Sequence, residues 1–327
     1  MFRGRVVLRG LFFGVCLILT TGWAEQAGSQ VKYPTRSIDM IIGYAPGGSN
    51  DLTTRVVGEF LKKKWGVTLN VISKPGGATI PAQLEVYKAK PNGYTLFVDG
   101  TSTNITLEIA VKDLPFKVMD RTFICMHSIA PYVICVPPAS PYKSLKDLFE
   151  DLKKDPEHFT YASAGALATH DIIFRQACKI LGVDPLKSKP IVVQGAAQSA
   201  ALTAQGAIKL GGGSVSSQLT GIQAGTLRAL AVCGKEGWFQ FPNVPTAEES
   251  GYPSLRADQW NGVSGPPKTP AYVVEAWEKA MQEMTKDQET ISKLKNIGAI
   301  LNYLGSEEIR NYCLSFLAEL KDLWGLK

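Results

Sequence analysis

The chain has 327 residues, of which 45% are hydrophobic and 20% charged, and its formal net charge is +6. A chain of this length and composition has enough apolar residues for a packed core, so it excludes a disordered protein and needs no metal or disulfide framework. The length indicates about two domains. The basic residues are scattered along the chain, which argues against nucleic-acid binding.

The first 24 residues have the pattern of a cleaved secretory signal peptide. Basic residues up to Arg9 precede an apolar run at 11–19, and Gly22 and Ala24 are the small residues of a cleavage site. The alternative is a membrane anchor, but the run is shorter than the ~20 residues that a spanning helix needs. We therefore expect export to the periplasm, with residues 1–24 removed. Removal would lower Lys plus Arg from 35 to 32 against 29 Asp plus Glu, a net charge of about +3.

The cysteines and histidines predict no metal site. All six cysteines except Cys16 follow the signal peptide, and the remaining odd number leaves at least one free thiol. Neither the cysteines nor the three histidines have metal-ligand spacing, so no metal and no cofactor are expected. These residues are Cys125, Cys135, Cys178, Cys233, Cys313, His127, His158 and His170.

Strands and helices alternate over the first hundred residues of the predicted mature chain. Short β-type runs alternate with segments in which apolar residues recur every three or four positions. This order indicates a mostly parallel sheet with helices on its faces. The predicted elements are a strand at 37–43, a helix at 52–65 ended by Gly66, a strand at 68–72, a helix marked by Ile80, Leu84 and Tyr87, and a strand after the turn at Asn92-Gly93.

A second series of the same kind begins near Pro131. Its predicted elements are a strand at 132–136, a helix at 144–154 with Ser144 as N-cap, a strand and loop at 159–165, a helix at 171–182, a strand, loop and helix at 189–206, a strand followed by a glycine loop at 208–213, and a strand at 227–234.

The last part of the chain is predicted to return to the first series. Prolines between 242 and 270 indicate a connection, and two long helices follow near 270–296 and 306–324. Pro270 would take the first helical position of one helix, and Ser306 would cap the other. We expect two α/β lobes, one formed by 31–130 plus 256–327 and the other by 131–255. The chain would cross between them near 128–132 and 250–262.

The loop "APGGSND", residues 45–51, is the main candidate binding element. It lies where a strand becomes a helix, and the first turn of a helix has backbone N–H groups without partners and a partial positive charge. Glycines let a ligand approach this backbone, and the Ser49 hydroxyl can donate a hydrogen bond. The alternative is a tight connection in which Asn50 or Asp51 only caps the helix. Asp51 is expected to orient the loop or cap the helix rather than bind an anion.

Similar loops follow strands of the second series, and two such sets facing each other would hold a small anion. The phosphate motifs G-x-G-x-x-G and G-x-x-x-x-G-K-[ST] do not occur, which favours a carboxylate over a nucleotide. No G-x-S-x-G elbow is present, and Ser163 near His170 is weak support for catalysis, so no enzymatic activity is expected. The candidate ligand-binding residues are Pro46, Gly47, Gly48, Ser49, Asn50, Asp51, Ser163, Ala164, Gly165, Thr169, His170, Gln194, Gly195 and Gly213.

Several blocks of sequence resemble the substrate-binding proteins of tripartite tricarboxylate transporters, the family also called Bordetella uptake gene (Bug) receptors. They include "YPTRSIDMIIGYAPGGSND", "PNGYTLFV", "YASAG", "VQGAAQSAALTAQGAI" and "FPNVPTAEESGYP", in the family order. The resemblance implies a type II periplasmic binding protein fold with a ligand cleft between two lobes. It also implies that a monomer captures a small carboxylate through the loops at 46–51 and 163–170 and delivers it to a membrane permease.

The chain departs from the family pattern at several loop positions. Ser73-Lys74-Pro75-Gly76 replaces the usual Asn-Arg-Pro-Gly, and 79–82 replaces a Gly-Asn-Ile-Gly stretch. His170 stands one place before the usual histidine, and Gly213 stands where an aspartate is common. These losses of polar side chains predict a ligand with one well-held carboxylate and a less polar remainder, such as an aromatic acid. The alternatives are a receptor that signals to a membrane kinase and a periplasmic hydrolase.

Overall fold

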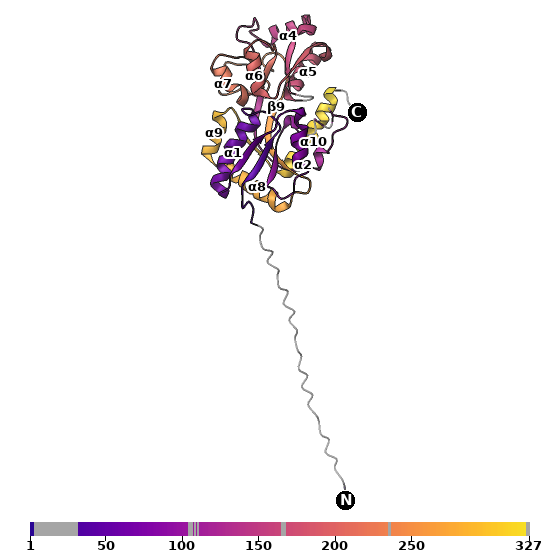
Figure 1. The fold of residues 1–327 in the computed structure, drawn as a ribbon, viewed down its shortest axis with the longest axis vertical. Coiled ribbons are helices and arrows are strands. Elements are labelled where there is room, and N and C mark those ends of the chain that lie inside the picture. The colour runs from indigo at the N-terminus through magenta and orange to yellow at the C-terminus, as the bar shows by residue number, and fades with distance from the viewer. Residues whose placement is uncertain are drawn as a thin grey trace. The chain divides into compact units, whose positions relative to one another are not determined.

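In the computed structural model, the first hundred residues of the predicted mature chain form the alternating series expected from the sequence (Figure 1). The central strand β1 pairs in parallel with strands on both sides, and Gly66 ends the first helix in a left-handed conformation. The elements are β1 (Ile38–Ile42), α1 (Ser49–Trp65), β2 (Leu69–Ser73), α2 (Ile80–Tyr87) and β3 (Thr95–Gly100). Each strand therefore ends at the same edge of the sheet, where the loop before α1 lies.

The structure describes residues 1–2, 32–103, 107, 109, 111–164, 168–234 and 237–324. The predicted signal peptide lies outside these residues apart from its first two, so it stays a prediction. Residues Tyr33–Lys327 form one compact unit, which contains all the elements named in the text. No helix within the described ranges is long and apolar enough to cross a membrane.

Two strands, β4 (Thr122–Val136) and β9 (Asp258–Gly265), carry the chain between the two ends of this unit. β4 pairs over its first part with β9 and β10 (Ile300–Leu304), and over its second part with β7 (Gly211–Ser214) and β8 (Arg228–Val232). All of these pairings are antiparallel, and β9 also pairs antiparallel with β3. The parallel order is confirmed for β1, β2 and β3, but the sheet as a whole is mixed. The strands β4 and β9, which run between the two halves, pair in the antiparallel direction with their neighbours. The order is β10-β4-β9-β3-β1-β2.

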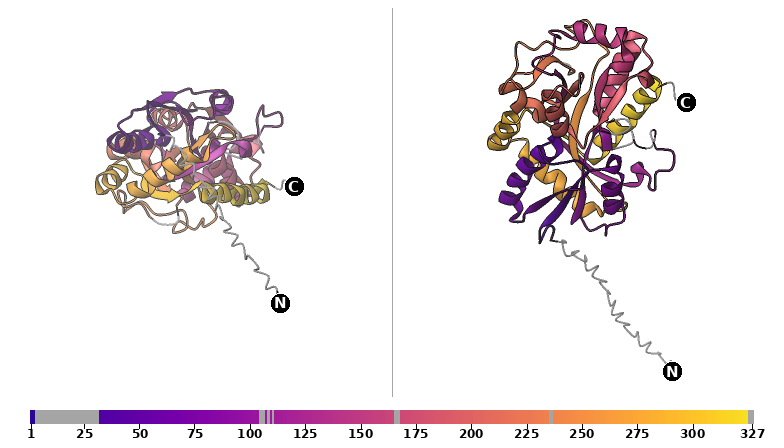
Figure 2. Two further views of the ribbon diagram at one scale, coloured as in Figure 1. Left: turned by 90° about the horizontal axis from the view of Figure 1, so that it is seen from below. Right: turned by 45° about the horizontal axis from the view of Figure 1, so that its top comes forward.

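We call the end that holds β1–β3, α1, α2 and α8 the first lobe, and the end that holds β5–β8 and α4–α7 the second lobe. Figure 1 shows these helices gathered at opposite ends with β9 between them, and the right-hand view of Figure 2 shows the same separation. Each lobe has its own apolar core, with Trp277 and Met281 in the first and Phe149 and Phe174 in the second. The boundaries predicted for the lobes at 130/131 and 255/256 remain a proposal.

In the second lobe, one strand lies a few residues later than predicted, and one helix was not predicted at all. β7 consists of the glycines at 211–213 and Ser214 rather than residues 208–210, and α7 follows it directly. A Cβ on Gly212 would lie 2.2 Å from the Val133 carbonyl oxygen, so only glycine lets β7 approach β4 this closely. The second-lobe elements are α4 (Leu145–Lys154), β5 (Thr160–Ser163), α5 (Thr169–Leu181), β6 (Lys189–Val192), α6 (Ala196–Ala204) and α7 (Val215–Gln223).

The C-terminal region also differs from its prediction. The helix expected at 270–296 is divided into α8 (Ala271–Met284) and α9 (Gln288–Asn296), because the Asp287 side chain caps a new helix by accepting from Thr290 N. Pro270 is the N-cap of α8 rather than its first residue. Ser306 is the first residue of α10 (Ser306–Trp324), and its hydroxyl donates to the Phe123 carbonyl instead of capping the helix.

The N-terminus of α4 gives a test of local stability. Ser144 Oγ accepts from Asp147 N at 3.2 Å, and Asp147 Oδ2 accepts from Ser144 N at 3.0 Å, which is a capping box. We expect Ser144→Ala to lower the free energy of unfolding by about 1 kcal/mol in urea titrations. Ser315→Ala removes a hydroxyl that bonds only to the preceding turn of α10 and should change it by less than about 0.5 kcal/mol. Equal losses in both variants would contradict a role for the cap.

Candidate ligand-binding cleft

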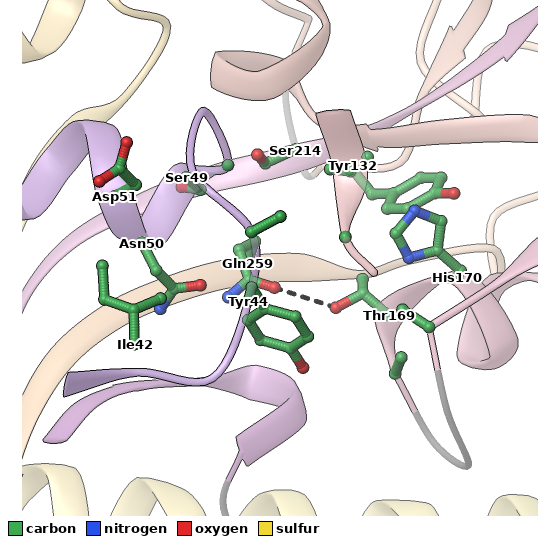
Figure 3. Close-up of a pocket in the computed structure, with 17 residues that line it drawn as sticks. Ile42, Tyr44, Ser49, Asn50, Asp51, Tyr132, Thr169, His170, Ser214 and Gln259 are labelled. Atoms are coloured by element: carbon green, nitrogen blue, oxygen red, sulfur yellow. Dashed lines mark hydrogen bonds between the residues drawn. The ribbon is translucent and has the colours of Figure 1, made fainter. Parts of the chain in front are cut away.

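A cavity of about 50 Å³ lies between the lobes, and residues from both lobes line it (Figure 3). Its lining residues come from the ends of β1 and β7, the loops after β1 and β5, the N-termini of several helices, and the two strands that join the lobes. They are Ile42, Tyr44, Ala45, Gly48, Ser49, Asn50, Asp51, Tyr132, Ala164, Ala168, Thr169, His170, Gly195, Ala196, Gly213, Ser214 and Gln259.

The N-termini of four helices meet at this cavity. Gly48 is the N-cap of α1, Ala168 of α5, Gly195 of α6 and Ser214 of α7, and all four residues line it. The first N–H groups of a helix have no partner within the helix, and together they carry about half a positive charge. Of the lining residues that the structure describes, none is a lysine or an arginine. The positive potential of the cleft therefore comes from the backbone.

Ser49 supplies a hydroxyl at the start of α1. Asn261 on β9 donates through Nδ2 to Ser49 Oγ at 3.0 Å, and the same Nδ2 lies 3.3 Å from Ser128 Oγ on β4. Asn261 is fully buried, so these bonds hold its side chain between the two strands and the helix. Ser49 Oγ accepts this bond from Asn261, and its own O–H group can donate to a ligand in the cleft.

Asp51 organises the loop that precedes α1. Its Oδ2 accepts from Gly47 N at 3.0 Å, and its Oδ1 accepts from Arg55 Nε at 2.9 Å. Arg55 also places Nη2 2.8 Å from Oδ1, although the arginine side chain is more than half exposed. The Asp51 charge is thus compensated within α1, and this geometry agrees with the predicted role in orienting the loop.

Asn50 forms part of the cleft lining above a buried ion pair. Its Nδ2 donates to the Asp99 carbonyl oxygen at 3.2 Å. The Asp99 carboxylate accepts from Thr103 Oγ1 and Gly100 N through Oδ1, and Arg121 Nη2 lies 3.2 Å from Oδ2 without hydrogen-bond geometry. The floor of the first lobe is therefore fixed by a charged pair that is itself out of contact with solvent.

The second lobe presents His170 and Thr169 at the start of α5. His170 Nε2 lies 3.0 Å from the Gly212 carbonyl oxygen, and the ring packs edge-on against Tyr132 with centroids 5.5 Å apart. Burial lowers the pKa of His170 to about 4, so the ring is neutral at physiological pH. Thr169 Oγ1 donates to Gln259 Oε1 at 3.0 Å, which joins α5 to β9 (Figure 3).

Nine of the predicted residues line the cleft, and four others do not. Ser163 is turned to Asp171, donating to Oδ2 at 2.8 Å, and is not part of the described lining. Gln194 is also outside the lining, but its carbonyl oxygen accepts from Ala45 N at 3.3 Å, a direct contact between the lobes. Pro46 and Gly47 are in the loop but outside the lining, and Gly165 is outside the described residues.

Eight lining residues were missed by the sequence analysis. Ala45, Ala168 and Ala196 lie within segments that the sequence analysis had already singled out, but only other residues of those segments were named as candidates. Tyr132 and Gln259 lie on β4 and β9, where long-range strand pairing decides the position and no local pattern indicates it. The others are Ile42, Tyr44 and Ser214.

Gly213 has no room for an aspartate, the residue that the family resemblance led us to compare with this position. A Cβ there would lie 2.7 Å from Gln218 Nε2 and Ser217 Oγ, and 2.8 Å from Ala196 Cβ. The neighbouring side chains therefore fill the space that an acidic side chain would need.

No set of three or more His, Cys, Asp or Glu side chains in the described residues could hold a metal ion. Cys125, Cys135, Cys178, Cys233 and Cys313 are all buried and unpaired.

The mixed sheet, the two strands that join the lobes and the cleft between them define a periplasmic binding protein of the two-lobed α/β type. The model of the tripartite tricarboxylate transporter family receptor matches residues 53–313. The chain therefore belongs to this family of periplasmic substrate-binding proteins, the TctC or Bug family.

Curated relatives of the chain include members from two bacterial genera. The UPF0065 protein of the tcbD-tcbE intergenic region of Pseudomonas sp. (strain P51) is 27% identical over 298 residues, covering 89% of this chain and 85% of that protein. BugT of Bordetella pertussis (strain Tohama I / ATCC BAA-589 / NCTC 13251) is 27% identical over 291 residues, covering 86% of each chain.

Solved structures share the fold over nearly the whole described unit. A periplasmic transporter is 27% identical with a TM-score of 0.84, covering 90% of this chain and 98% of the other. The periplasmic binding protein BugD is 24% identical with a TM-score of 0.82, covering 90% and 99%. MatC of Rhodopseudomonas palustris, with bound malate, is 19% identical with a TM-score of 0.82, covering 89% and 99%.

Proposed function

We propose that this protein is a periplasmic solute-binding protein that captures a small organic carboxylate and delivers it to the membrane permease of a tripartite tricarboxylate-type transporter. The observation that carries the proposal is the meeting of four helix N-termini at one cavity without a lysine or arginine in its described lining. Unpartnered backbone N–H groups and the Ser49 hydroxyl suit a single carboxylate, which few donors can satisfy.

The remainder of the ligand is proposed to be less polar than its carboxylate. Ile42, Tyr44, Tyr132 and several alanines present apolar surface to the cavity. No lysine or arginine in the described lining faces them, so a second carboxylate would gain less there than an apolar or aromatic group. The malate bound to MatC supports organic acids as the ligand class of this fold but does not specify the acid for this chain.

Binding would act by a shift between open and closed arrangements of the lobes. A ligand that touches α1 in the first lobe and α5 in the second stabilises the closed arrangement, because only there can it bond to both lobes at once. In the absence of ligand, closure would form two contacts. One joins Thr169 to Gln259, and the other joins Ala45 to Gln194. In this scheme the protein acts as an exported monomer and performs no chemistry of its own.

The hydrogen bonds of the candidate residues do not support hydrolase activity. Ser163 donates to Asp171, whereas His170 Nε2 bonds to the Gly212 carbonyl, so no bond joins Ser163 to His170. The serine therefore has no histidine base in hydrogen-bond contact. Signalling to a membrane kinase remains the second candidate, which a genetic neighbour encoding a permease would disfavour.

Calorimetric titration with a panel of small organic acids tests the proposal. We expect wild-type protein to bind at least one acid, and Ser49→Ala to bind it about 10- to 100-fold more weakly, because a hydrogen bond to a charged group is lost. Ser315→Ala, in an exposed part of α10, is the matched control and should bind like wild type. The proposal fails if no acid binds or if Ser49→Ala binds as tightly as the control.

A further inference from the structure

We propose that the cleft selects carboxylates that also carry a hydroxyl group, and that Nδ1 of His170 accepts the hydrogen bond from that hydroxyl. This inference rests on the proposed function and names the ligand class more narrowly. It follows from which atoms of the cleft can donate and which can only accept.

The hydrogen bond at Nε2 determines the tautomer of His170. The Gly212 carbonyl oxygen, 3.0 Å from Nε2, can only accept, so Nε2 must carry the proton. The same oxygen also accepts from Ser199 Oγ at 3.0 Å. A neutral imidazole has a single N–H group, and the depressed pKa of His170 keeps the ring neutral. Nδ1 is therefore an acceptor with a free lone pair.

This lone pair belongs to a buried residue in the wall of the cavity. His170 is 6% exposed and lines the cleft. Among the described residues, its ring forms a hydrogen bond through Nε2 and none through Nδ1. Figure 3 shows the ring between Tyr132 and Thr169, on the side of the cavity opposite Ser49. A carboxylate oxygen facing Nδ1 would be repelled, because both atoms are acceptors. An O–H group would instead donate a hydrogen bond to Nδ1.

The opposite wall of the cavity, at Ser49 and the N-terminus of α1, offers hydrogen-bond donors. Ser49 Oγ uses one of its two lone pairs to accept from Asn261 Nδ2, and its O–H group can donate to a ligand carboxylate. The ligand carboxylate is thus directed to Ser49 and the N-terminus of α1, and its hydroxyl to His170 on α5. One ligand then bonds to both lobes.

A hydroxyl suits the His170 side better than an ammonium group does. Four helix N-termini make the cavity unfavourable for a positively charged ligand group. Asp51, the carboxylate in the described lining, already has Arg55 and Gly47 N as partners. A hydroxy acid should therefore bind better than the corresponding amino acid.

Calorimetry with matched acids tests the inference. The sets are lactate, propionate and alanine, and mandelate, phenylacetate and phenylglycine. In at least one set, we expect the hydroxy acid to bind about tenfold or more tightly than the other two acids. His170→Phe keeps a ring against Tyr132 but removes the acceptor, so the preference over the deoxy acid should disappear. His158→Phe, at an exposed histidine bonded to Asp155, should retain it.

Nitrogen-15 NMR of histidine-labelled wild-type protein provides a readout that does not depend on the folding of a variant. We expect His170 as the Nε2–H tautomer, with its Nδ1 signal moved by the hydroxy acid and not by the deoxy acid. Equal affinities for hydroxy and deoxy acids, or an Nδ1–H tautomer, would overturn the inference and leave the proposed function intact. Failure of every organic acid to bind would overturn the proposed function itself.

Discussion

Replacement of Arg121 by methionine is expected to lower the free energy of unfolding by about 3–5 kcal/mol. Arg121 and Asp99 are both buried, and their side chains lie 3.2 Å apart beneath the cleft. The variant would leave the Asp99 carboxylate without its cation, and the Thr103 carbonyl and Ser264 hydroxyl without their guanidinium donors. Urea or thermal unfolding measures the loss.

An exposed ion pair provides the control for this prediction. Lys63 Nζ lies 2.7 Å from Glu289 Oε2, with both side chains more than half exposed, so Lys63→Met should cost no more than about 1 kcal/mol. Asp99→Asn combined with Arg121→Met should lose less than Arg121→Met alone, because no uncompensated charge stays buried. A similar small loss at both sites would show that Arg121 does not support the floor of the first lobe.

Replacement of Asp171 by asparagine is expected to stabilise the protein at pH 8 by up to about 4 kcal/mol and to have little effect near pH 4. Burial raises the pKa of Asp171 from 3.8 to about 7, while the bond from Ser163 and the charge of Arg175 oppose the shift. The buried tyrosines Tyr132 and Tyr161 also face it from β4 and β5.

The direction of this pH dependence follows from the number of protons that the folded and unfolded states bind at Asp171. Between pH 4 and 7 the folded state holds a proton on Asp171 that the unfolded state has lost, so stability falls as the pH rises through this range. Asparagine cannot ionise, yet its Oδ1 can still accept from Ser163 Oγ. Thermal melting of both proteins at pH 4 and pH 8 tests the prediction, and an equal difference at both values would contradict it.

Ser163→Ala is the matched variant for Asp171. The Ser163 hydroxyl donates to the carboxylate and lowers its pKa, so removal of this hydroxyl should move the wild-type pH dependence to higher pH. In the Asp171→Asn background the same change should leave the pH dependence unaltered. Ser163→Ala should therefore shift the titration of Asp171, whereas Asp171→Asn should remove it.

Local signals predicted much of the fold. Gly66 and Ser144 mark helix ends through their own backbone conformation and side-chain bonds, and both act as predicted. β9 was missed because its sequence, DQWNGVSG, has little β-propensity and is stabilised by pairing with β3 and β4 on its two sides. Such pairing depends on residues more than a hundred positions away, which no local pattern contains.

The candidate site could be predicted where it consists of loops after strands. Gly48, Ser49 and Thr169 line the cleft because helix N-termini gather at the carboxyl edges of the sheets. The partner of each hydroxyl was not predictable, since Ser163 turns to Asp171 within the second lobe whereas Ser49 accepts from Asn261 on a joining strand. The partners and directions of these bonds required the tertiary structure.

The central claim is that backbone donors at helix N-termini hold the negative charge of a small acid. It is tested most directly by calorimetry of the wild-type protein with the tightest-binding acid and with the primary amide of the same acid, which has nearly the same shape and no charge. We expect the amide to bind about 100-fold more weakly than the carboxylate, or not measurably. Equal affinity for the amide and the carboxylate would contradict the claim.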